Sequence, residues 1–281
     1  MSVCPACGGS PRPWRPGIEV CARCGSAVRG WVPDARERQT HYSGYHEEAP
    51  GLSPLTRDRL AAWAEALLPH RRLGRLLEVG CGVGHFLEAA RAVGFDAWGT
   101  EVSSSGLQKL RERGLHALPG ELPDLGLPVA HFDAVVLFEV IEHLPDPSRY
   151  LSECHRVLRE GGVLLLTTPN FDSLSRRLLG ERWRVVDPEH LVLFTSRGLR
   201  VALERAHFRV RDLSSRNLDP TEVLRGLRRE PPRPTAERQA EIDACRSALA
   251  GRPGLRTVKA AANAVLRWLS AGDTLEAWAG R

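Results

Sequence analysis

Short apolar runs alternate with glycine-marked turns in the middle of the chain. Leu76–Val79 is apolar apart from one acid and leads into Gly80, which predicts a short buried strand followed by a glycine loop. The pattern from His85 to Val93 predicts a helix that ends at Gly94. Phe95–Glu101 then predicts a second strand. This order of strand, glycine loop, helix and strand is typical of a unit that binds a nucleotide-type ligand at a helix amino terminus.

The same alternation continues toward the carboxyl end. Phe132–Leu144 indicates a buried strand and the turn that follows it. Leu151–Leu158 predicts a helix, the pair Gly161-Gly162 predicts a turn, and Val163–Thr168 predicts another strand. Strands that alternate with helices indicate an α/β fold with a doubly wound, mostly parallel sheet.

The last two predicted strands, Phe208–Leu213 and Thr274–Ala279, lie about sixty residues apart. We interpret residues 219–271 between them as an insertion, with helix-like segments at 236–249 and 255–269. The insertion is expected to be a lid, a contact surface or a helical cover on the sheet edge.

Length and composition are those of an ordinary globular protein. The 281 residues, 42% of them hydrophobic, are enough for one large domain and one small module. The longest clean apolar runs, Ala134–Phe138 and Val163–Leu166, are far shorter than the roughly 18 residues of a membrane-spanning helix. The start of the chain lacks the basic and apolar stretches of a secretory signal. We therefore expect no membrane span, a cytoplasmic location, and cysteines that are thiols or metal ligands.

A formal net charge of +5 raises the question of a nucleic-acid partner. Only Lys109 and Lys259 among the 39 basic residues are lysines, which points as much to a general bias toward arginine as to selection for a partner. A solvated, arginine-rich surface is therefore the favoured interpretation.

Two C-x2-C pairs stand thirteen residues apart near the amino terminus. Each spacing lets two thiolates turn inward on one tight loop, and a glycine follows each pair. The doubled spacing predicts a structural zinc held by Cys4, Cys7, Cys21 and Cys24, with two disulfides or a redox pair as alternatives. We expect a zinc ribbon at 1–31, a linker and a segment at the mouth of the active site at 32–53, and the large domain at 54–281.

The glycine loop departs from a dinucleotide-binding fingerprint. It has the form G-x-G-x-G over Gly80, Gly82 and Gly84, with Glu78 just before it. An acid at that position would repel a pyrophosphate but suits a ligand with ammonium and sulfonium charges, such as S-adenosylmethionine. Glu101 ends the second strand, 23 residues after Glu78, where a carboxylate can accept both ribose hydroxyls.

From Tyr42 to Arg281 the chain resembles the class I S-adenosylmethionine-dependent methyltransferases. The resemblance implies a seven-stranded, Rossmann-like sheet and a cofactor site at the glycine loop. Glu121 would meet the adenine amino group, although aspartate is commoner there in the family. The cofactor-binding residues that it implies are Glu78, Gly80, Cys81, Gly82, Gly84, Glu101, Val102, Glu121, Leu122, Phe138 and Glu139.

Glu139, Glu142 and His143 follow the fourth strand at positions i, i+3 and i+4, which share one face of a helical turn. The pattern is similar to that of ubiquinone-biosynthesis O-methyltransferases and of small-RNA 3′-end 2′-O-methyltransferases. In the second group a downstream histidine completes a divalent metal site, and His190 could fill that place. We therefore expect either a site for magnesium or manganese, a direct acid/base role for His143 or His190 assisted by Glu142, or a structural turn.

Tyr42 and Tyr45 resemble the aromatic segment that closes over cofactor and acceptor in this family, and Trp183 and Phe194 could form an aromatic wall beside His190. Each is alternatively a plain core residue. The leading hypothesis is O-methylation of a small-molecule acceptor: a natural product, a sugar or a phenol. The alternatives are a 2′-O RNA methyltransferase that uses the ribbon and the arginines, and a binding module that has lost catalysis.

Overall fold

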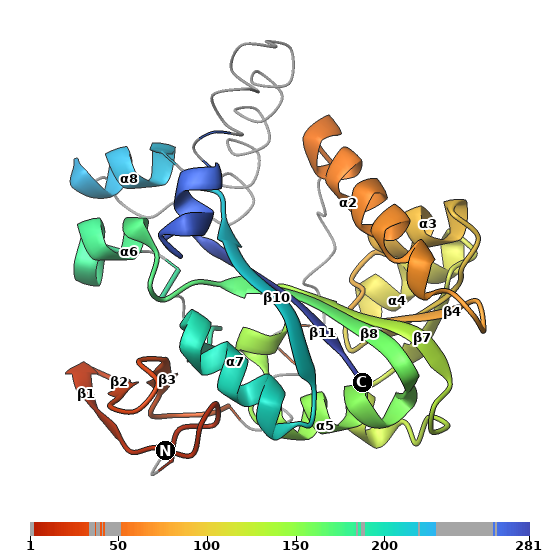
Figure 1. The fold of residues 1–281 in the computed structure, drawn as a ribbon, viewed down its shortest axis with the longest axis horizontal. Helices are drawn as coiled ribbons and strands as arrows, with labels where there is room; N and C mark the ends of the chain where they lie inside the picture. Colours follow the sequence, from red (N-terminus) through yellow and green to blue (C-terminus); the bar gives the residue numbers. More distant parts are fainter. Residues whose placement is uncertain are drawn as a thin grey trace.

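The computed structural model describes residues 3–33, 37, 40, 42, 52–183, 185–186, 189–218, 220–228, 261 and 263–281. Figure 1 shows a large twisted sheet with helices on both faces and a small group of strands, β1 to β3, beside helix α7. Within the part of the chain that the structure describes, no helix is long and apolar enough to cross a membrane.

The large sheet has seven strands in the order β10-β11-β8-β7-β4-β5-β6. Only β11 runs antiparallel to its neighbours, β8 and β10. The predicted doubly wound, mostly parallel seven-stranded sheet is thus confirmed. The strands are β4 (Arg75–Val79), β5 (Asp96–Glu101), β6 (His116–Pro119), β7 (Phe132–Phe138), β8 (Leu158–Pro169), β10 (Arg209–Arg216) and β11 (Thr274–Gly280).

Helices cover the two faces of this sheet and divide its core. On one face, α2 (Pro54–Ala66), α3 (His85–Ala92) and α4 (Ser104–Glu112) bury side chains such as Trp63, Phe86 and Leu110. On the other, α5 (Pro147–Val157) and α7 (Ser196–Arg205) bury Leu151 and Leu203. Apolar residues recur at helical spacing on these segments, so each helix presents one apolar face to the strands. One helical layer therefore packs on each face of the sheet.

Hydroxyl or carboxylate side chains cap the first turns of several helices in this domain. Ser53, Ser103, Asp146 and Thr195 accept hydrogen bonds from the first backbone N–H groups of α2, α4, α5 and α7. Short helices join the larger elements: η1 (Leu68–His70), η2 (Leu122–Asp124), η3 (Ile141–His143), α6 (Leu174–Leu179) and η4 (Gly180–Arg182).

Strand β8 begins earlier than the sequence predicts. A turn was expected at Gly161-Gly162, whereas the strand already starts at Leu158 and runs through both glycines. The register against β7 jumps between the pairs Phe132↔Leu158 and Ala134↔Val163. The extra residues form a bulge, and Gly161 sits there at a φ of 72°. The glycines therefore bend a continuous strand.

The amino-terminal strands form a second sheet that includes a strand of the large domain. Its order is β1 (Pro11–Arg15), β2 (Ile18–Cys21), β3 (Ala27–Arg29) and β9 (Val192–Leu193). Because β9 comes more than 160 residues after β3, this sheet joins the ribbon to the large domain. The boundaries predicted at residues 31 and 53 stay predictions.

The last two strands of the large sheet, β10 and β11, pair directly despite the long segment between them. The described parts of that segment contain α8 (Pro220–Leu227) and a helical stretch at 263–268. The predicted helix at 236–249 and most of 255–262 lie outside the described residues.

Candidate functional site

A cavity of about 960 Å³ opens at the carboxyl ends of β4, β5 and β7. In an open parallel sheet this edge is where ligands bind, because the loops after neighbouring strands diverge there. The cavity runs from the glycine loop to His143 in η3. Among the lining residues that the structure describes, four are acidic: Glu101, Glu121, Asp124 and Glu139.

The glycine loop enters the cavity with left-handed backbone angles. Gly80 and Gly82 line the wall with φ values of 68° and 56°, and Gly84 starts α3 at a φ of 83°. These angles are strained for any residue with a side chain. A Cβ atom on Gly80 would also lie 2.8 Å from the side chain of Val140. The local sequence therefore permits a tight turn whose backbone lies in the cavity wall without side chains in the way.

Glu101 holds this loop in place. Its carboxylate accepts hydrogen bonds from the backbone N–H groups of Gly82 at 2.8 Å, Val102 at 2.9 Å and Ser103 at 2.6 Å. Burial raises the pKa of Glu101, and these three hydrogen bonds oppose that shift. The side chain also forms part of the cavity wall. Glu101 is thus both a support of the loop and a carboxylate available to a ligand.

Glu78 lies buried behind the loop. One of its carboxylate oxygens, Oε2, is buried without a hydrogen-bond partner. Burial raises its pKa strongly, and the negative charge of Glu101 raises it further. Two neighbouring buried carboxylates create a negative potential that a cation would relieve.

We call the part of the cavity that contains the glycine loop its cofactor half. Val102, Glu121 and Leu122 also belong to the wall of this half. The Tyr150 hydroxyl donates to Glu121 Oε2 at 2.7 Å and orients that carboxylate. Phe138 closes one side, where it stacks on Trp63 at a centroid distance of 4.6 Å. Tyr150 is a wall residue that the sequence pattern did not indicate.

Three predicted cofactor residues lie outside the described wall of the cavity: Glu78, Cys81 and Gly84. Cys81 is buried, donates its backbone N–H to Thr100 O at 3.0 Å and places its sulfur beneath Gly99. A Cβ atom on Gly84 would meet Leu115 and Leu110 at 2.5 and 2.6 Å. Cys81 and Gly84 thus shape the loop from behind it.

At the other end, Glu142, His143 and His190 come together. One ligand atom from each lies within 4.8 Å of the others, and the two imidazole centroids are 4.7 Å apart. Glu142 Oε2 accepts from the Thr168 hydroxyl at 2.9 Å, whereas Oε1 is buried without a hydrogen-bond partner, 4.0 Å from His143 Nε2. Burial, and then the charge of Glu139, raise the pKa of Glu142.

The two histidines differ in position. His143 lines the cavity, and its Nδ1 lies 3.4 Å from the Tyr42 hydroxyl. His190 is not in the described wall and stands behind His143. Its Nδ1 lies 2.5 Å from the carbonyl of Val185, which can only accept, so Nδ1 is the donor of this hydrogen bond.

The expected shared face of Glu139 with Glu142 and His143 is wrong. Glu139 has a left-handed φ of 55°, and the short helix η3 begins only at Ile141. No helical turn therefore begins at Glu139, and Glu139 does not share a helix face with Glu142 and His143. Its side chain lines the cavity but does not join the group of Glu142, His143 and His190.

The predicted aromatic residues separate into two groups. Tyr42 lines the cavity, and Tyr45 lies outside the described residues. Trp183 is 2% exposed and packs with Phe171 and Leu193 beneath the ribbon, so it is a core residue and not a wall of the cavity. Phe194 is fully buried as well.

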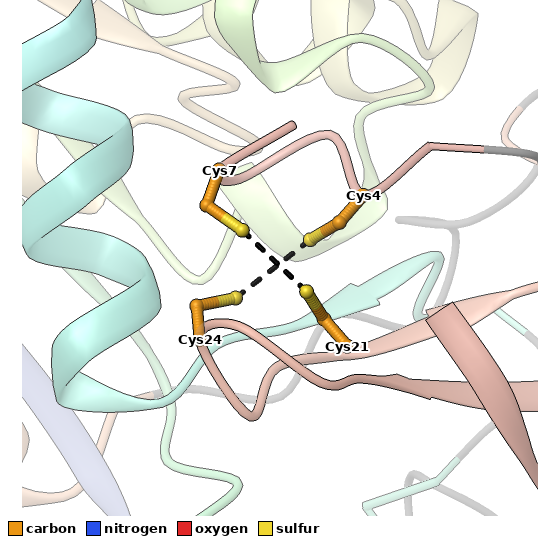
Figure 2. Close-up of side chains that lie close together, drawn as sticks. All are labelled: Cys4, Cys7, Cys21 and Cys24. Carbon is orange, nitrogen blue, oxygen red and sulfur yellow. Dashed lines mark hydrogen bonds between the residues drawn. The ribbon is translucent and has the colours of Figure 1, made fainter. Parts of the chain in front are cut away.

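The four amino-terminal cysteines form a separate cluster. Their sulfur atoms point toward a common centre and lie within 4.8 Å of one another (Figure 2). Cys4 and Cys24 are 3.7 Å apart, and Cys7 and Cys21 are 3.5 Å apart. All four are buried, and the backbone N–H of Gly9 points at Cys7 Sγ from 3.4 Å. The hydrogen bond from the Cys4 thiol lowers the pKa of Cys24, which favours the thiolate form there.

Comparisons with known proteins agree with this geometry. The methyltransferase domain family matches residues 53–213. A probable S-adenosylmethionine-dependent methyltransferase of Mycolicibacterium smegmatis is 38% identical over 148 residues, which are 52% of this chain and 56% of the relative. A ubiquinone biosynthesis O-methyltransferase of Cereibacter sphaeroides is 33% identical over 129 residues, 42% of this chain and 51% of that protein. The chain spans about half the length of these curated relatives.

Solved structures share the fold. The [4+2]-cyclase SpnF aligns with a TM-score of 0.58 and 21% identity, over 89% of this chain and 97% of its own. A SAM-dependent methyltransferase of Archaeoglobus fulgidus aligns with a TM-score of 0.52 and 20% identity, over 80% and 94%. The family match covers more than half of the chain. With its seven-stranded sheet and glycine loop, the chain therefore belongs to the methyltransferase domain family, alongside S-adenosylmethionine-dependent relatives.

Proposed function

We propose that the chain transfers a methyl group from S-adenosylmethionine to a hydroxyl oxygen of a small-molecule metabolite: a natural product, a sugar or a phenol. The observation that carries this proposal is one continuous cavity with the glycine loop and Glu101 at one end and His143 at the other. The O-methyltransferase among the relatives supports transfer to oxygen.

The residues present fit a cationic cofactor. Glu78 has a buried oxygen without a hydrogen-bond partner, and the cavity wall carries the acids Glu101, Glu121 and Glu139. Arg149, also in the wall, is paired with Asp124 at 2.7 Å. A negative site attracts ammonium and sulfonium groups and repels a pyrophosphate. The balance of charge therefore favours S-adenosylmethionine over a dinucleotide.

Each residue of the cofactor half has a role in binding. Gly80 and Gly82, which have no side chains, would let a ligand approach the backbone closely, Glu101 would accept the ribose hydroxyls, and Glu121, oriented by Tyr150, would accept from the adenine amino group. When bound, the cofactor supplies a methyl group on a positively charged sulfur. The cavity then contributes by holding an acceptor oxygen in line with that methyl group.

His143 is the residue we assign to proton removal, since it lines the acceptor end. The Tyr42 hydroxyl beside Nδ1 and the carboxylate of Glu142 near Nε2 hold the ring between two polar groups. A hydroxyl acceptor must lose a proton during transfer, so an imidazole here would accelerate the reaction.

A divalent cation is the alternative use of the same residues. Glu142, His143 and His190 offer one carboxylate oxygen and imidazole nitrogens within 4.8 Å, and Glu142 Oε1 has no hydrogen-bond partner. Two imidazoles suit manganese better than magnesium, which prefers oxygen ligands. A cation there would supply Lewis acidity toward an acceptor oxygen.

We also propose that Cys4, Cys7, Cys21 and Cys24 hold one structural zinc. Four buried sulfurs around one centre fit a tetrahedral thiolate site, and all ligand positions would be filled by protein. Such a zinc would stabilise the ribbon and would not contact the reacting groups, since none of the four cysteines is among the described lining residues of the cavity.

An RNA acceptor has less support. The acidic cavity wall would repel a phosphate backbone, and none of the relatives described above has RNA in its name. The formal net charge of +5 is the argument in favour of RNA.

The test is a transfer assay with S-adenosylmethionine labelled in its methyl group. The full chain is incubated with a metabolite extract and, separately, with total RNA, and the label is followed in each. We expect label in small molecules, stable to mild alkali as methyl ethers are. His143→Ala should lose most of this transfer, whereas the control His207→Asn, at an exposed turn position after α7, should keep it. Label in RNA alone would overturn the proposed acceptor class.

A further inference from the structure

The ribbon pairs with the segment that directly follows His190, next to the end of the cavity that His143 lines, which we call the acceptor end. Strand β3 pairs with β9 through Ala27↔Leu193 and Val28↔Val192. Strand β9 begins two residues after His190. Val28 and Val192 are fully buried at this joint, so the pairing belongs to the core.

Hydrogen bonds carry this contact to the site itself. The backbone N–H of Arg29 donates to Leu191 O at 2.9 Å, and the N–H of Leu191 donates to Glu142 O at 2.7 Å. The guanidinium Nε of Arg29 donates to the carbonyl of His190 at 3.3 Å. One residue of the ribbon thus binds the carbonyl of His190 and the carbonyl of the residue after it.

The cysteine cluster is tied to the other end of β9. The Thr195 hydroxyl donates to the carbonyl of Cys24 at 2.6 Å, and the Thr195 N–H donates to the Ser26 hydroxyl at 3.2 Å. Ser26 in turn accepts the N–H of Cys21 through its own carbonyl at 2.9 Å. The loop from His190 to Thr195 is therefore held at both ends by the ribbon.

We propose that the ribbon positions His190 against His143, so that metal in the four-cysteine cage supports the acceptor end of the cavity without touching the cofactor end. A segment of some thirty residues needs its metal to fold. Without it, β9 would lose its partner strand, and the carbonyls of His190 and Leu191 would lose their hydrogen bonds from Arg29.

The cofactor half should be insensitive to this change. Among the described lining residues, none precedes Tyr42 in the chain, and Glu101 and the glycine loop belong to the opposite side of the site. Loss of the metal is therefore expected to affect the reaction at the acceptor while leaving cofactor affinity as it is. The inference about activity rests on the proposed function, whereas the inference about the His190 loop does not.

Hydrogen exchange measured by mass spectrometry on the full chain tests the loop directly. In Cys21→Ser, and in the parent after metal removal, peptides covering 189–195 should exchange at least about tenfold faster. S-adenosylhomocysteine affinity by calorimetry should stay within about twofold. Glu19→Gln, on the neighbouring strand β2, is the matched control and should change neither value.

A second variant covers the case in which Cys21→Ser fails to fold. Arg29→Ala keeps all four cysteines and the metal content but loses the guanidinium contact to His190. It should raise the acceptor KM or lower kcat and shift the His190 ring signals in NMR spectra, and Arg29→Lys should restore part of the effect. Unchanged exchange at 189–195 without metal, or cofactor affinity that falls in parallel with it, would overturn the proposal. Absence of cofactor binding in the parent would instead contradict the proposed function.

Discussion

Replacing Glu101 with alanine separates support of the glycine loop from binding of the cofactor. The carboxylate accepts three backbone N–H groups, those of Gly82, Val102 and Ser103. Gly82 and Val102 face the cavity, where water can replace the lost partner, but Ser103 is fully buried. One orphaned donor costs about 1–3 kcal/mol, so the free energy of unfolding should fall by that amount.

In Glu101→Ala, the free energy of cofactor binding should fall by more than the free energy of unfolding. Two hydroxyl groups that donate to one carboxylate contribute about 1.5–3 kcal/mol each. Their combined loss of about 3–6 kcal/mol corresponds to a roughly 10²- to 10⁴-fold weaker complex. Calorimetry with S-adenosylhomocysteine gives the affinity, and urea denaturation gives the stability.

Glu88→Ala is the matched control, because Glu88 is a half-exposed carboxylate on α3 that pairs with Arg113 away from the cavity. It should leave cofactor affinity within about twofold of the parent. The reasoning fails if Glu101→Ala loses stability as expected but binds the cofactor within about threefold of the parent. In that case the carboxylate would only support the loop.

Elemental analysis should find about one zinc per chain, and Cys21→Ser should lose it; metal-free parent protein with a folded ribbon would exclude the zinc site. Gly84→Ala should lower the free energy of unfolding by about 2–4 kcal/mol in chemical denaturation, from a left-handed φ and contacts near 2.5 Å; an unchanged midpoint would contradict this. Burial alone would raise the pKa of Asp133, but Arg159 and backbone N–H groups lower it, so Asp133→Asn should cost about 1.5–3 kcal/mol at pH 7. The difference in the free energy of unfolding between the parent and Asp133→Asn should shrink as the pH falls through the lowered pKa of Asp133. A difference that stays constant in denaturation experiments from pH 7 down to 3 would refute this. If activity survives a mild chelator that spares the ribbon but is lost in His143→Ala, the imidazole acts without a divalent cation.

Features encoded locally could be predicted from the sequence. The glycine loop, Glu101 and the doubled cysteine pairs follow from spacing along a few residues. The structure places Glu101 beside the glycine loop and, elsewhere, the four cysteine sulfurs around one centre. The alternation of strands and helices likewise sufficed for the sheet, because right-handed crossovers leave few topologies. Membership in the methyltransferase domain family agrees with these patterns.

Features that depend on distant parts of the chain could not be predicted. The contacts of Arg29 with His190 and of Tyr150 with Glu121 join residues that no periodicity connects. Glu139 does not lie on the predicted helix face, because its own left-handed backbone angle, directly after β7, interrupts the helical spacing. Trp183 packs beneath the ribbon, and only the pairing of β3 with β9 shows why.

The most direct test of the central claim is an NMR titration of the full chain with S-adenosylhomocysteine. Backbone amide signals of Gly80, Gly82 and Val102 should shift and saturate at one ligand per chain, because these amides surround the predicted cofactor site. Amides of the ribbon strands β1 and β2 should stay in place. No shift at the glycine loop, or shifts confined to another part of the chain, would contradict the assignment of this cavity to the methyl donor.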